Sequence, residues 1–402
     1  MISKKKAVAW IIVALLVTNI ATFVGSNYFS IISGSKVLIA KQDYDLFGEF
    51  NKLFVVRNII EKKYIDKIDE SKLVEGAVRG LAAGVGDPYT EYISPTELQA
   101  MNTEMQGEYA GVGLVVTMLD DKVTVVSPIE DTPGYKAGIK SGDIIIGVDR
   151  KGISGKKLNE VVDLLKGKPG TKVVITLAKK GETAPVDVTI IRENVVLNPI
   201  KSEMLKDNIG YIRITTFNQE NVASLFHKAL QDLKSKGYKG LILDLRDNGG
   251  GLLDQCTKIA DELLGEGIIV YTIDNQGKKE VINSDKNKID VPLVVLVNGG
   301  TASASEIVSG AVKDTNAGTL IGTKTFGKGI VQTIIPLPQD KSAIKVTIAR
   351  YYTPSGVCIQ GIGIEPNIVL DLTDEQKKKT VLTRQEDTQL TKAIEVMKQK
   401  IQ

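Results

Sequence analysis

The spacing of apolar residues changes along the chain, and each change predicts a different kind of structure. Between residues 44 and 105 apolar side chains recur every three or four positions, which predicts helices. From 107 to 192, short apolar runs separated by turns predict strands, with one amphipathic helix over 158–165. From 195 onward strands alternate with helical segments, which predicts an α/β body with a partly parallel sheet. The pattern therefore favours a multidomain α+β protein.

The N-terminal stretch predicts a membrane anchor. Three lysines at positions 4–6 precede an uncharged apolar run, AVAWIIVALLVTNIATFVG. Such a run is long enough to span a bilayer, and the preceding positive charge places the N-terminus in the cytoplasm. A cleavable signal peptide is the alternative, but the run is long for one and no A-x-A site follows. We therefore expect an uncleaved single-pass anchor in the cell membrane within residues 1–26, with the rest of the chain outside the cytoplasm.

Two strand–turn–helix units stand out in the C-terminal half of the chain. They read LILDLR-DNGGG-LLDQ and PLVVLVN-GGTA-SASEI. Ser303 falls near the start of the second helix, beside unpaired backbone N–H groups and the positive end of the helix dipole. Both features could stabilise the oxyanion that forms when a serine attacks a carbonyl. Ser303 is therefore a candidate nucleophile.

A serine nucleophile needs a base, and the chain has one histidine, His227. His227 lies in an amphipathic helical pattern, which is typical of a histidine on a helix surface or core edge. Lys328 in TFGKG is the better candidate, because burial can lower the pKa of a lysine from about 10.4 toward neutrality. Gln332 lies four positions further on in a strand pattern, so it would face the same side and could hold the lysine amine. The simpler interpretation is that Ser303 only caps a helix and that Lys328 lies in a surface turn.

Composition and spacing exclude several other functions. A formal net charge of +3 and few aromatic residues argue against a nucleic-acid surface. The stretch GTKTFGKG nearly matches a phosphate-binding loop, but Gly329 replaces the required hydroxyl residue and a strand pattern follows. Cys256 and Cys358 form no metal-ligand pattern, so we expect no metal or other cofactor. Whether these two cysteines form a disulfide is left open.

The segment TASASEIVSGAVKD followed by TFGKGIVQ resembles the active-site signature of the carboxyl-terminal-processing proteases, also called tail-specific proteases. The resemblance implies Ser303 as nucleophile, Lys328 as base and Gln332 as the supporting amide. It also implies a catalytic core with a crotonase-like ββα fold.

The DNGGG turn of this chain resembles the second turn that forms the oxyanion hole in that family. The resemblance implies an oxyanion hole made by the N–H of Ala304 and that of Gly250 or Gly251. Glycine there lets the backbone approach the substrate closely. The family often has proline where Gly249 stands, so a looser turn is expected here.

Residues 106–193 resemble a PDZ domain over their whole pattern of strands and turns. Gly111, Val112, Gly113 and Leu114 match its carboxylate-binding loop, whose N–H groups capture the C-terminal carboxylate of a peptide. The expected partners are therefore protein and peptide substrates with free C-termini. A regulatory partner of this domain is left open.

The remaining segments complete the predicted organisation. The pattern LVEGAVRGLAAGVGDPYTEY resembles the family's N-terminal module, which implies that residues 27–105 mediate homodimerisation. Residues 194–372 form the predicted peptidase core. The charged tail, 373–402, is expected to be helical and either solvated or at a dimer contact.

These observations together predict a membrane-anchored serine endopeptidase that recognises C-terminal tails. The alternative is a non-catalytic PDZ scaffold, in which Ser303 only caps a helix. A chymotrypsin-like protease with a PDZ domain is excluded because the chain lacks a suitable histidine.

Overall fold

The structure is a computed structural model that divides into two compact units, one before and one after the Val85–Gly86 bond. The predicted N-terminal module ran to residue 105, whereas residues 86–105 belong to the second unit. The described residues are 10, 12–20, 22, 32–33, 36–37, 41–119, 121–129, 131–156, 158–179, 184–196, 198–338, 340–377, 379 and 382–402.

The first unit is mainly helical, as predicted. Asp69 caps the second long helix, because its carboxylate accepts hydrogen bonds from the N–H groups of Ser71 and Lys72. Arg57 on the first long helix forms an ion pair with Glu70 on the second. Both helices expose large apolar side chains. The elements are β1 (Ile32–Ser33), β2 (Lys36–Val37), α2 (Lys41–Lys63) and α3 (Glu70–Ala83).

Only part of the predicted membrane anchor can be compared with the structure. Residues 10, 12–20 and 22 are helical, and the rest of the segment lies outside the described residues. Within the described ranges, no helix combines the length and apolar character that crossing a bilayer requires. The anchor therefore stays a prediction.

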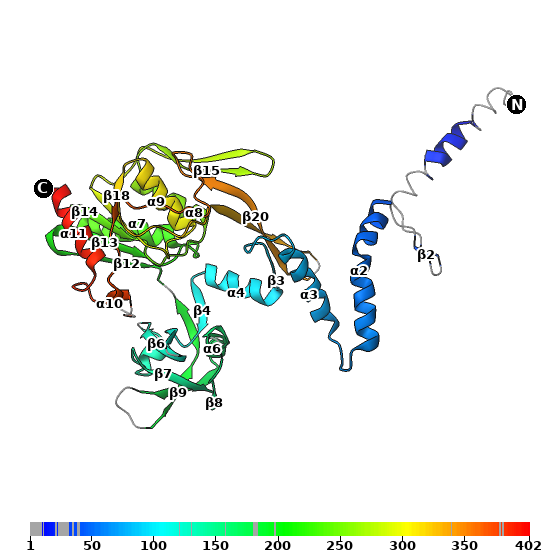
Figure 1. The fold of residues 1–402 in the computed structure, drawn as a ribbon, viewed down its shortest axis with the longest axis horizontal. Coiled ribbons are helices and arrows are strands. Elements are labelled where there is room, and N and C mark those ends of the chain that lie inside the picture. Colours follow the sequence, from blue (N-terminus) through cyan, green and yellow to red (C-terminus); the bar gives the residue numbers. More distant parts are fainter. Residues whose placement is uncertain are drawn as a thin grey trace. The chain divides into compact units, whose positions relative to one another are not determined.

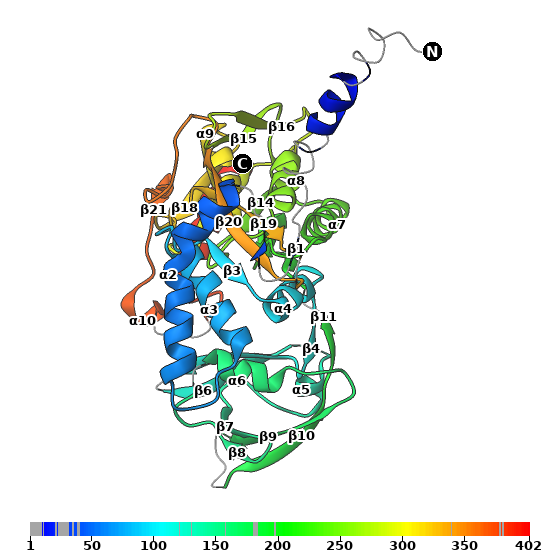
Figure 2. The same cartoon turned by 90° about the vertical axis from the view of Figure 1, so that its right-hand side faces the viewer.

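The predicted PDZ region forms an antiparallel sheet in the order β10-β9-β7-β6-β5, with β8 beside β7 (Figure 2). Alternate residues of β9 are buried, including Val173, Ile175 and Leu177, and α6 packs Val161 into the same core. The separate pair β4–β11 joins this region to the rest of the chain. The elements are β4 (Glu108–Gly111), β5 (Leu114–Leu119), β6 (Lys122–Pro128), α5 (Pro133–Lys136), β7 (Ile144–Val148), β8 (Lys151–Gly152), α6 (Leu158–Leu165), β9 (Lys172–Ala178), β10 (Val186–Ile191) and β11 (Glu193–Val196).

The C-terminal body contains the partly parallel sheet that the sequence predicts. Its order is β12-β13-β14-β17-β18-β21, in which β12 is antiparallel and the remaining neighbours are parallel (Figure 1). Helices α7, α8 and α9 follow strands β13, β14 and β17 of this sheet. The elements are β12 (Ile200–Met204), η1 (Lys206–Asn208), β13 (Ile209–Ile214), α7 (Val222–Ser235), β14 (Gly240–Asp244), α8 (Leu253–Leu263), β17 (Leu293–Val297), α9 (Ala304–Asp314), β18 (Gly318–Gly322) and β21 (Ile368–Val369).

A second, antiparallel sheet has the order β16-β15-β20-β19, with β3 from the start of the unit beside β20 (Figure 2). Strand β19 and its neighbour β20 carry residues that flank the candidate site. The elements are β3 (Glu91–Ile93), α4 (Pro95–Met105), β15 (Gly267–Asp274), β16 (Lys279–Ser284), β19 (Ile330–Pro336) and β20 (Ala343–Tyr352).

The C-terminal helix is part of the core. On β14, Leu241 and Leu243 belong to the apolar cluster shared with α7, α8 and α9, whereas Ile242 belongs to the cluster with the C-terminal helix. That helix, α11 (Thr388–Ile401), follows the short α10 (Asp374–Lys377) and buries Leu390, Ala393 and Met397. The expectation of a solvated helix is therefore wrong, because the apolar positions of α11 cover the parallel sheet, whereas the dimer contact stays a prediction.

A buried ion network holds α11 to the end of β14. The guanidinium of Arg246 donates to Asp244, with Nη2 2.6 Å from Oδ2, and to Asp387, with Nη2 2.8 Å from Oδ2. Tyr211 donates its hydroxyl to Asp244 at 2.7 Å. Burial alone would raise the pKa of Asp244, but the hydrogen bonds and charge of Arg246 hold that pKa below its usual value. Asp244 therefore stays ionised inside the core.

We expect Arg246→Met to lower the free energy of unfolding by about 3–5 kcal/mol at neutral pH, because two buried carboxylates lose their partner. The loss should shrink as the pH falls, since protonation of the carboxylates removes the buried charge. Denaturant unfolding followed by circular dichroism measures both effects.

Arg350→Met on the exposed face of β20 is the matched control, and its effect should stay within about 0.5 kcal/mol. Equal effects of the two substitutions would contradict a stabilising role for the network.

Candidate active site

Ser303 stands in a strained turn between β17 and α9. It occupies the N-cap position of α9 with φ 55° and ψ −117°, a conformation that costs about 1–3 kcal/mol for a residue other than glycine. Its side chain is half-buried, whereas Ser305 is 0% exposed and donates its Oγ to the carbonyl of Asn248 at 2.9 Å. Of these two serines, Ser303 is the one available for chemistry.

Glu306 connects the nucleophile turn to the lysine turn. Its side chain is 0% exposed. Oε2 accepts the backbone N–H of Ser303 at 2.8 Å and that of Lys328 at 2.9 Å. Oε1 accepts the N–H of Gly327 at 2.7 Å and the hydroxyl of Thr325 at 2.5 Å. A single carboxylate therefore fixes the backbones of both candidate residues.

Tyr351 makes a second connection between the same two turns. Its hydroxyl lies 3.0 Å from the carbonyl oxygen of Ser303 and within hydrogen-bond distance of the carbonyl oxygen of Lys328. The ring is almost fully buried, and burial raises the pKa of Tyr351 well above its usual value. Tyr351 therefore acts as a neutral hydrogen-bond donor.

The side chain of Lys328 is half-buried, and its Nζ lies 4.5 Å from the centre of the Tyr89 ring. Burial lowers the pKa of Lys328, and the positive charge of Lys345 adds to this effect. The negative charges of Asp87 and Glu91 oppose it. Among the described residues, no hydrogen bond joins Nζ to Oγ of Ser303. The turn that carries Lys328 is thus tied to the turn that carries Ser303, but the amine of Lys328 contacts the Tyr89 ring.

Gln332 lies on β19, opposite Thr347 of β20. Its Nε2 is buried and has no hydrogen-bond partner among the described groups. Lys328 precedes β19, which begins at Ile330, and the pairing shifts between Val331 and Gln332, so strand alternation does not relate the sides that Lys328 and Gln332 face. What remains is a buried donor that lacks an acceptor, which is uncommon in proteins.

The predicted oxyanion turn lies against Ser303, the candidate nucleophile. A Cβ on Gly250, which has φ 98°, would come within 2.8 Å of Cβ of Ser303, so only glycine fits there. The N–H of Gly250 already donates to Oδ1 of Asn248 at 3.0 Å. Within the described part of the chain, the N–H groups of Gly251 and Ala304 have no such acceptor. The geometry therefore favours Gly251 over Gly250 as the partner of Ala304.

The predicted carboxylate-binding loop forms the bend between β4 and β5. Gly111 ends β4, Val112 and Gly113 make the bend, and Leu114 begins β5. Burial raises the pKa of the Tyr109 phenol, and the backbone of Gly113 acts in the opposite direction. The Tyr109 ring lies beside the loop, because a Cβ on Gly111 would come within 2.8 Å of its Cε2.

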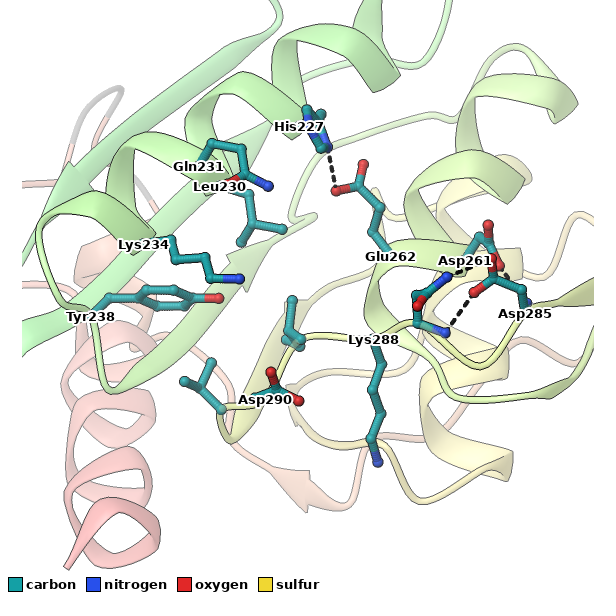
Figure 3. A pocket seen from close by; sticks show the side chains of 13 residues that line it. His227, Leu230, Gln231, Lys234, Tyr238, Asp261, Glu262, Asp285, Lys288 and Asp290 are labelled. Carbon is teal, nitrogen blue, oxygen red and sulfur yellow. Dashed lines mark hydrogen bonds and ion pairs between the residues drawn. The ribbon is translucent and has the colours of Figure 1, made fainter.

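His227 lies away from these residues. It sits on α7 with an exposed side chain, and its Nδ1 is 2.9 Å from Oε2 of Glu262 (Figure 3). This agrees with the predicted surface histidine. His227 lines a pocket of about 480 Å³, and none of the candidate catalytic or peptide-binding residues lines this pocket. The lining residues are His227, Leu230, Gln231, Lys234, Tyr238, Asp261, Glu262, Asp285, Asn287, Lys288, Ile289, Asp290 and Val291.

The two cysteines are free thiols in the structure. Cys256 is fully buried in the core cluster, and burial raises the pKa of its thiol. Cys358 is partly exposed. Neither thiol contributes to the candidate site.

Sequence reasoning missed the residues that hold the site together. Glu306 lies within the quoted TASASEIVSGAVKD motif, but the sequence assigned no role to it or to Asn248, Tyr351 and Tyr89. The available signals were a glutamate three positions after a helix-start serine and polar residues inside glycine-rich turns. Neither signal shows which distant backbone groups such a side chain binds.

A serine held this way at a helix start, in a chain that also carries a PDZ-type sheet, is typical of PDZ-containing serine peptidases. Residues 208–370 match Peptidase family S41, residues 110–190 match the PDZ domain, and residues 15–96 match the Activating protease CtpB N-terminal domain. The chain belongs to the carboxy-terminal-processing proteases of peptidase family S41 and is a serine peptidase.

Individual relatives agree over most of the chain. The carboxy-terminal-processing protease of Bartonella bacilliformis is 41% identical over 346 residues, which cover 84% of this chain and 77% of the relative. The carboxy-terminal processing protease CtpA of Bacillus subtilis is 36% identical over 369 residues, covering 91% and 77%. The solved structure of the photosystem II D1 C-terminal processing protease has a TM-score of 0.51 and 36% identity, covering 79% and 86%. The predicted family and the multidomain α+β fold are confirmed, and membership favours the peptidase over the scaffold.

We expect Glu306→Gln to lower kcat/KM by about 10²-fold or more. One carboxamide nitrogen would face two N–H or O–H donors, so two hydrogen bonds to a charged acceptor are lost, each worth about 1.5–3 kcal/mol. Peptide hydrolysis measures the loss. Labelling of Ser303 by a fluorophosphonate shows whether the nucleophile turn has moved.

Glu262→Gln at the His227 pocket is the matched control and should leave both readouts unchanged. Full labelling and full activity of Glu306→Gln would show that the turns do not need this carboxylate.

Proposed function

We propose that this serine peptidase cleaves peptide bonds with Ser303 as nucleophile and Lys328 as general base. The observation that carries this proposal is the shared binding of the two residues' backbone N–H groups by Glu306, which fixes the two turns side by side. The lowered pKa of Lys328 also supports it, because only a neutral amine can accept a proton.

In the proposed reaction, neutral Lys328 leaves the Tyr89 ring and accepts the proton of Ser303. Oγ of Ser303 attacks the scissile carbonyl and forms a tetrahedral intermediate. The ammonium of Lys328 then donates its proton to the leaving amine, and water hydrolyses the acyl-enzyme with the lysine again as base. The side-chain amide of Gln332, whose Nε2 has no partner among the described groups, orients the amine by accepting one of its N–H groups on Oε1, which leaves the lone pair free for the Ser303 proton.

The N–H groups of Ala304 and Gly251 form the proposed oxyanion hole. Ala304 is the first residue of α9, so its N–H points out of the helix start with the favourable end of the helix dipole. The other four residues of the DNGGG turn set the position of Gly251; they are Asp247, Asn248, Gly249 and Gly250. Removing one donor of such a hole typically costs about 10²–10³-fold in turnover.

Ser303→Ala and Lys328→Ala should each lower the cleavage rate by about 10³-fold or more, because each removes one member of the dyad. Lys328→Arg should fail as well, since an arginine stays protonated. Hydrolysis of an unfolded, tagged protein by the full chain measures the rates.

Lys324→Ala, on an exposed position of the same turn, is the matched control and should keep wild-type activity. Substantial cleavage by Lys328→Ala would assign the base to another group.

We propose that the PDZ domain binds the C-terminal tail of a protein at Gly111, Val112, Gly113 and Leu114. The peptide adds as a strand beside β5, with α6 as the other wall of the groove. Tail binding delivers the substrate or activates the site, and a regulatory partner would act through the same loop. The Tyr109 phenol, whose pKa the Gly113 backbone lowers, would compete with a bound carboxylate for that backbone group.

Tyr109→Phe should therefore tighten the binding of a peptide with a free C-terminus by about 2–10-fold, the effect of one net hydrogen bond. The substitution keeps the ring beside Gly111 and frees the backbone group of Gly113. Fluorescence anisotropy of a labelled peptide measures the affinity.

Tyr135→Phe on the exposed surface of α5 is the control in the same domain. A C-terminally amidated peptide should bind weakly to all variants. Equal binding of the amidated and free peptides would show that the loop does not read the carboxylate.

We further propose that the chain is anchored in the cell membrane by its N-terminal segment and acts outside the cytoplasm. The charge pattern at positions 4–6 and the apolar run after it support this. The apolar side chains that α2 and α3 expose, including Phe54 and Val74, support a homodimer formed through the first unit. The proposed division by role is 1–26, 27–105, 106–193, 194–372 and 373–402, in which residues 86–105 pack as part of the second compact unit.

A further inference from the structure

Tyr89 lies outside both the predicted peptidase core and its motifs, yet its ring touches the proposed base. We propose that Tyr89 is a positioning residue that holds the ammonium form of Lys328 away from Ser303 and releases the lysine when it loses its proton. This inference rests on the proposed dyad and adds a residue to it.

The segment that carries Tyr89 is built onto β20. Asp87 Oδ2 accepts the hydroxyls of Thr90 at 2.7 Å and Thr347 at 2.6 Å, and Asp87 Oδ1 accepts the N–H of Tyr89 at 3.1 Å. The N–H of Thr347 donates to Oγ1 of Thr90 at 3.3 Å. Strand β3 then continues the pairing with β20. The ring is thus fixed relative to the strand that also pairs with Gln332.

The contact favours one protonation state. An ammonium above an aromatic face is attracted by the ring quadrupole, and a neutral amine loses most of that attraction. Asp87 and Glu91 on the same segment also favour the cation, whereas burial and Lys345 of β20 favour the neutral form. Lys345 is itself ion-paired with Glu91. The cation therefore belongs on the ring, and the neutral amine is free to reach Ser303.

The direction of the effect on activity follows from this. The ring stabilises the protonated lysine and so raises the pH at which the base becomes active. In Tyr89→Leu the rising limb of kcat/KM against pH should move to lower pH by about half a unit, equivalent to about threefold more activity below the limb. Tyr89→Phe keeps the ring and should keep the wild-type limb.

The experiment uses the full chain and its Leu, Met and Phe variants at position 89. One readout is the pH profile of peptide hydrolysis. The other is the pH dependence of Lys328 acylation by an amine-reactive reagent, measured by mass spectrometry, also in the inactive Ser303→Ala background. Thermal unfolding identifies any variant that does not fold, and Tyr89→Met then replaces Tyr89→Leu.

A downward shift of both limbs in Leu and Met, absent in Phe, supports the proposal. Unchanged limbs in folded Leu and Met variants overturn it, as does an equal shift in Phe. A shift of the acylation limb without a shift of the hydrolysis limb would keep the role of Tyr89 and overturn Lys328 as the base. These outcomes therefore distinguish a failure of the Tyr89 proposal from a failure of the proposed Ser303–Lys328 pair.

Discussion

The site depends on one buried carboxylate. Glu306 is removed from water, which is costly for a charged group unless hydrogen bonds replace its hydration. Four donors do so, and three of them are backbone N–H groups of the nucleophile and lysine turns. Charge-assisted bonds of this kind are among the stronger ones in proteins. The carboxylate therefore holds Ser303 in a strained conformation that an isolated turn would not keep, and it sets the position of Lys328 relative to it.

The same turn is continuous with the buried core. Arg246 anchors the end of β14 through Asp244 and Asp387, and the glycine turn begins directly after it. Within that turn the carbonyl of Asn248 accepts the N–H of Ala302, one residue before the nucleophile. A rigid core is thereby connected, bond by bond, to the groups that surround the reacting carbonyl. Such a connection is what a site needs to hold its donors in place before the substrate arrives.

The sequence allowed much of this to be predicted, for identifiable reasons. The strand runs LILDL and PLVVLV and the helix starts after them follow local periodicity, and the motif resemblance located Ser303, Lys328 and the glycine turn. Contacts between distant segments could not be predicted in the same way. Tyr89 precedes the PDZ domain in the sequence and Lys328 follows it, yet the two side chains are in contact. Helix α11 covers the sheet although its composition is typical of a solvated helix. The shift in β19 pairing at Gln332 likewise has no local signature.

The connectivity of the second unit joins the PDZ domain to the segments on both sides of the candidate site. The segment that carries Tyr89 leads through β3 and α4 into the PDZ sheet. The carbonyl of Met105 at the end of α4 accepts the N–H of Glu220, and nearby Phe217 donates its N–H to the carbonyl of Gly250. The helix that enters the PDZ domain is therefore joined by the chain to the lysine side of the site and by hydrogen bonds to the oxyanion side. The PDZ domain therefore follows a helix that the chain links to the Tyr89 segment and that one hydrogen bond links to the segment between Phe217 and α7.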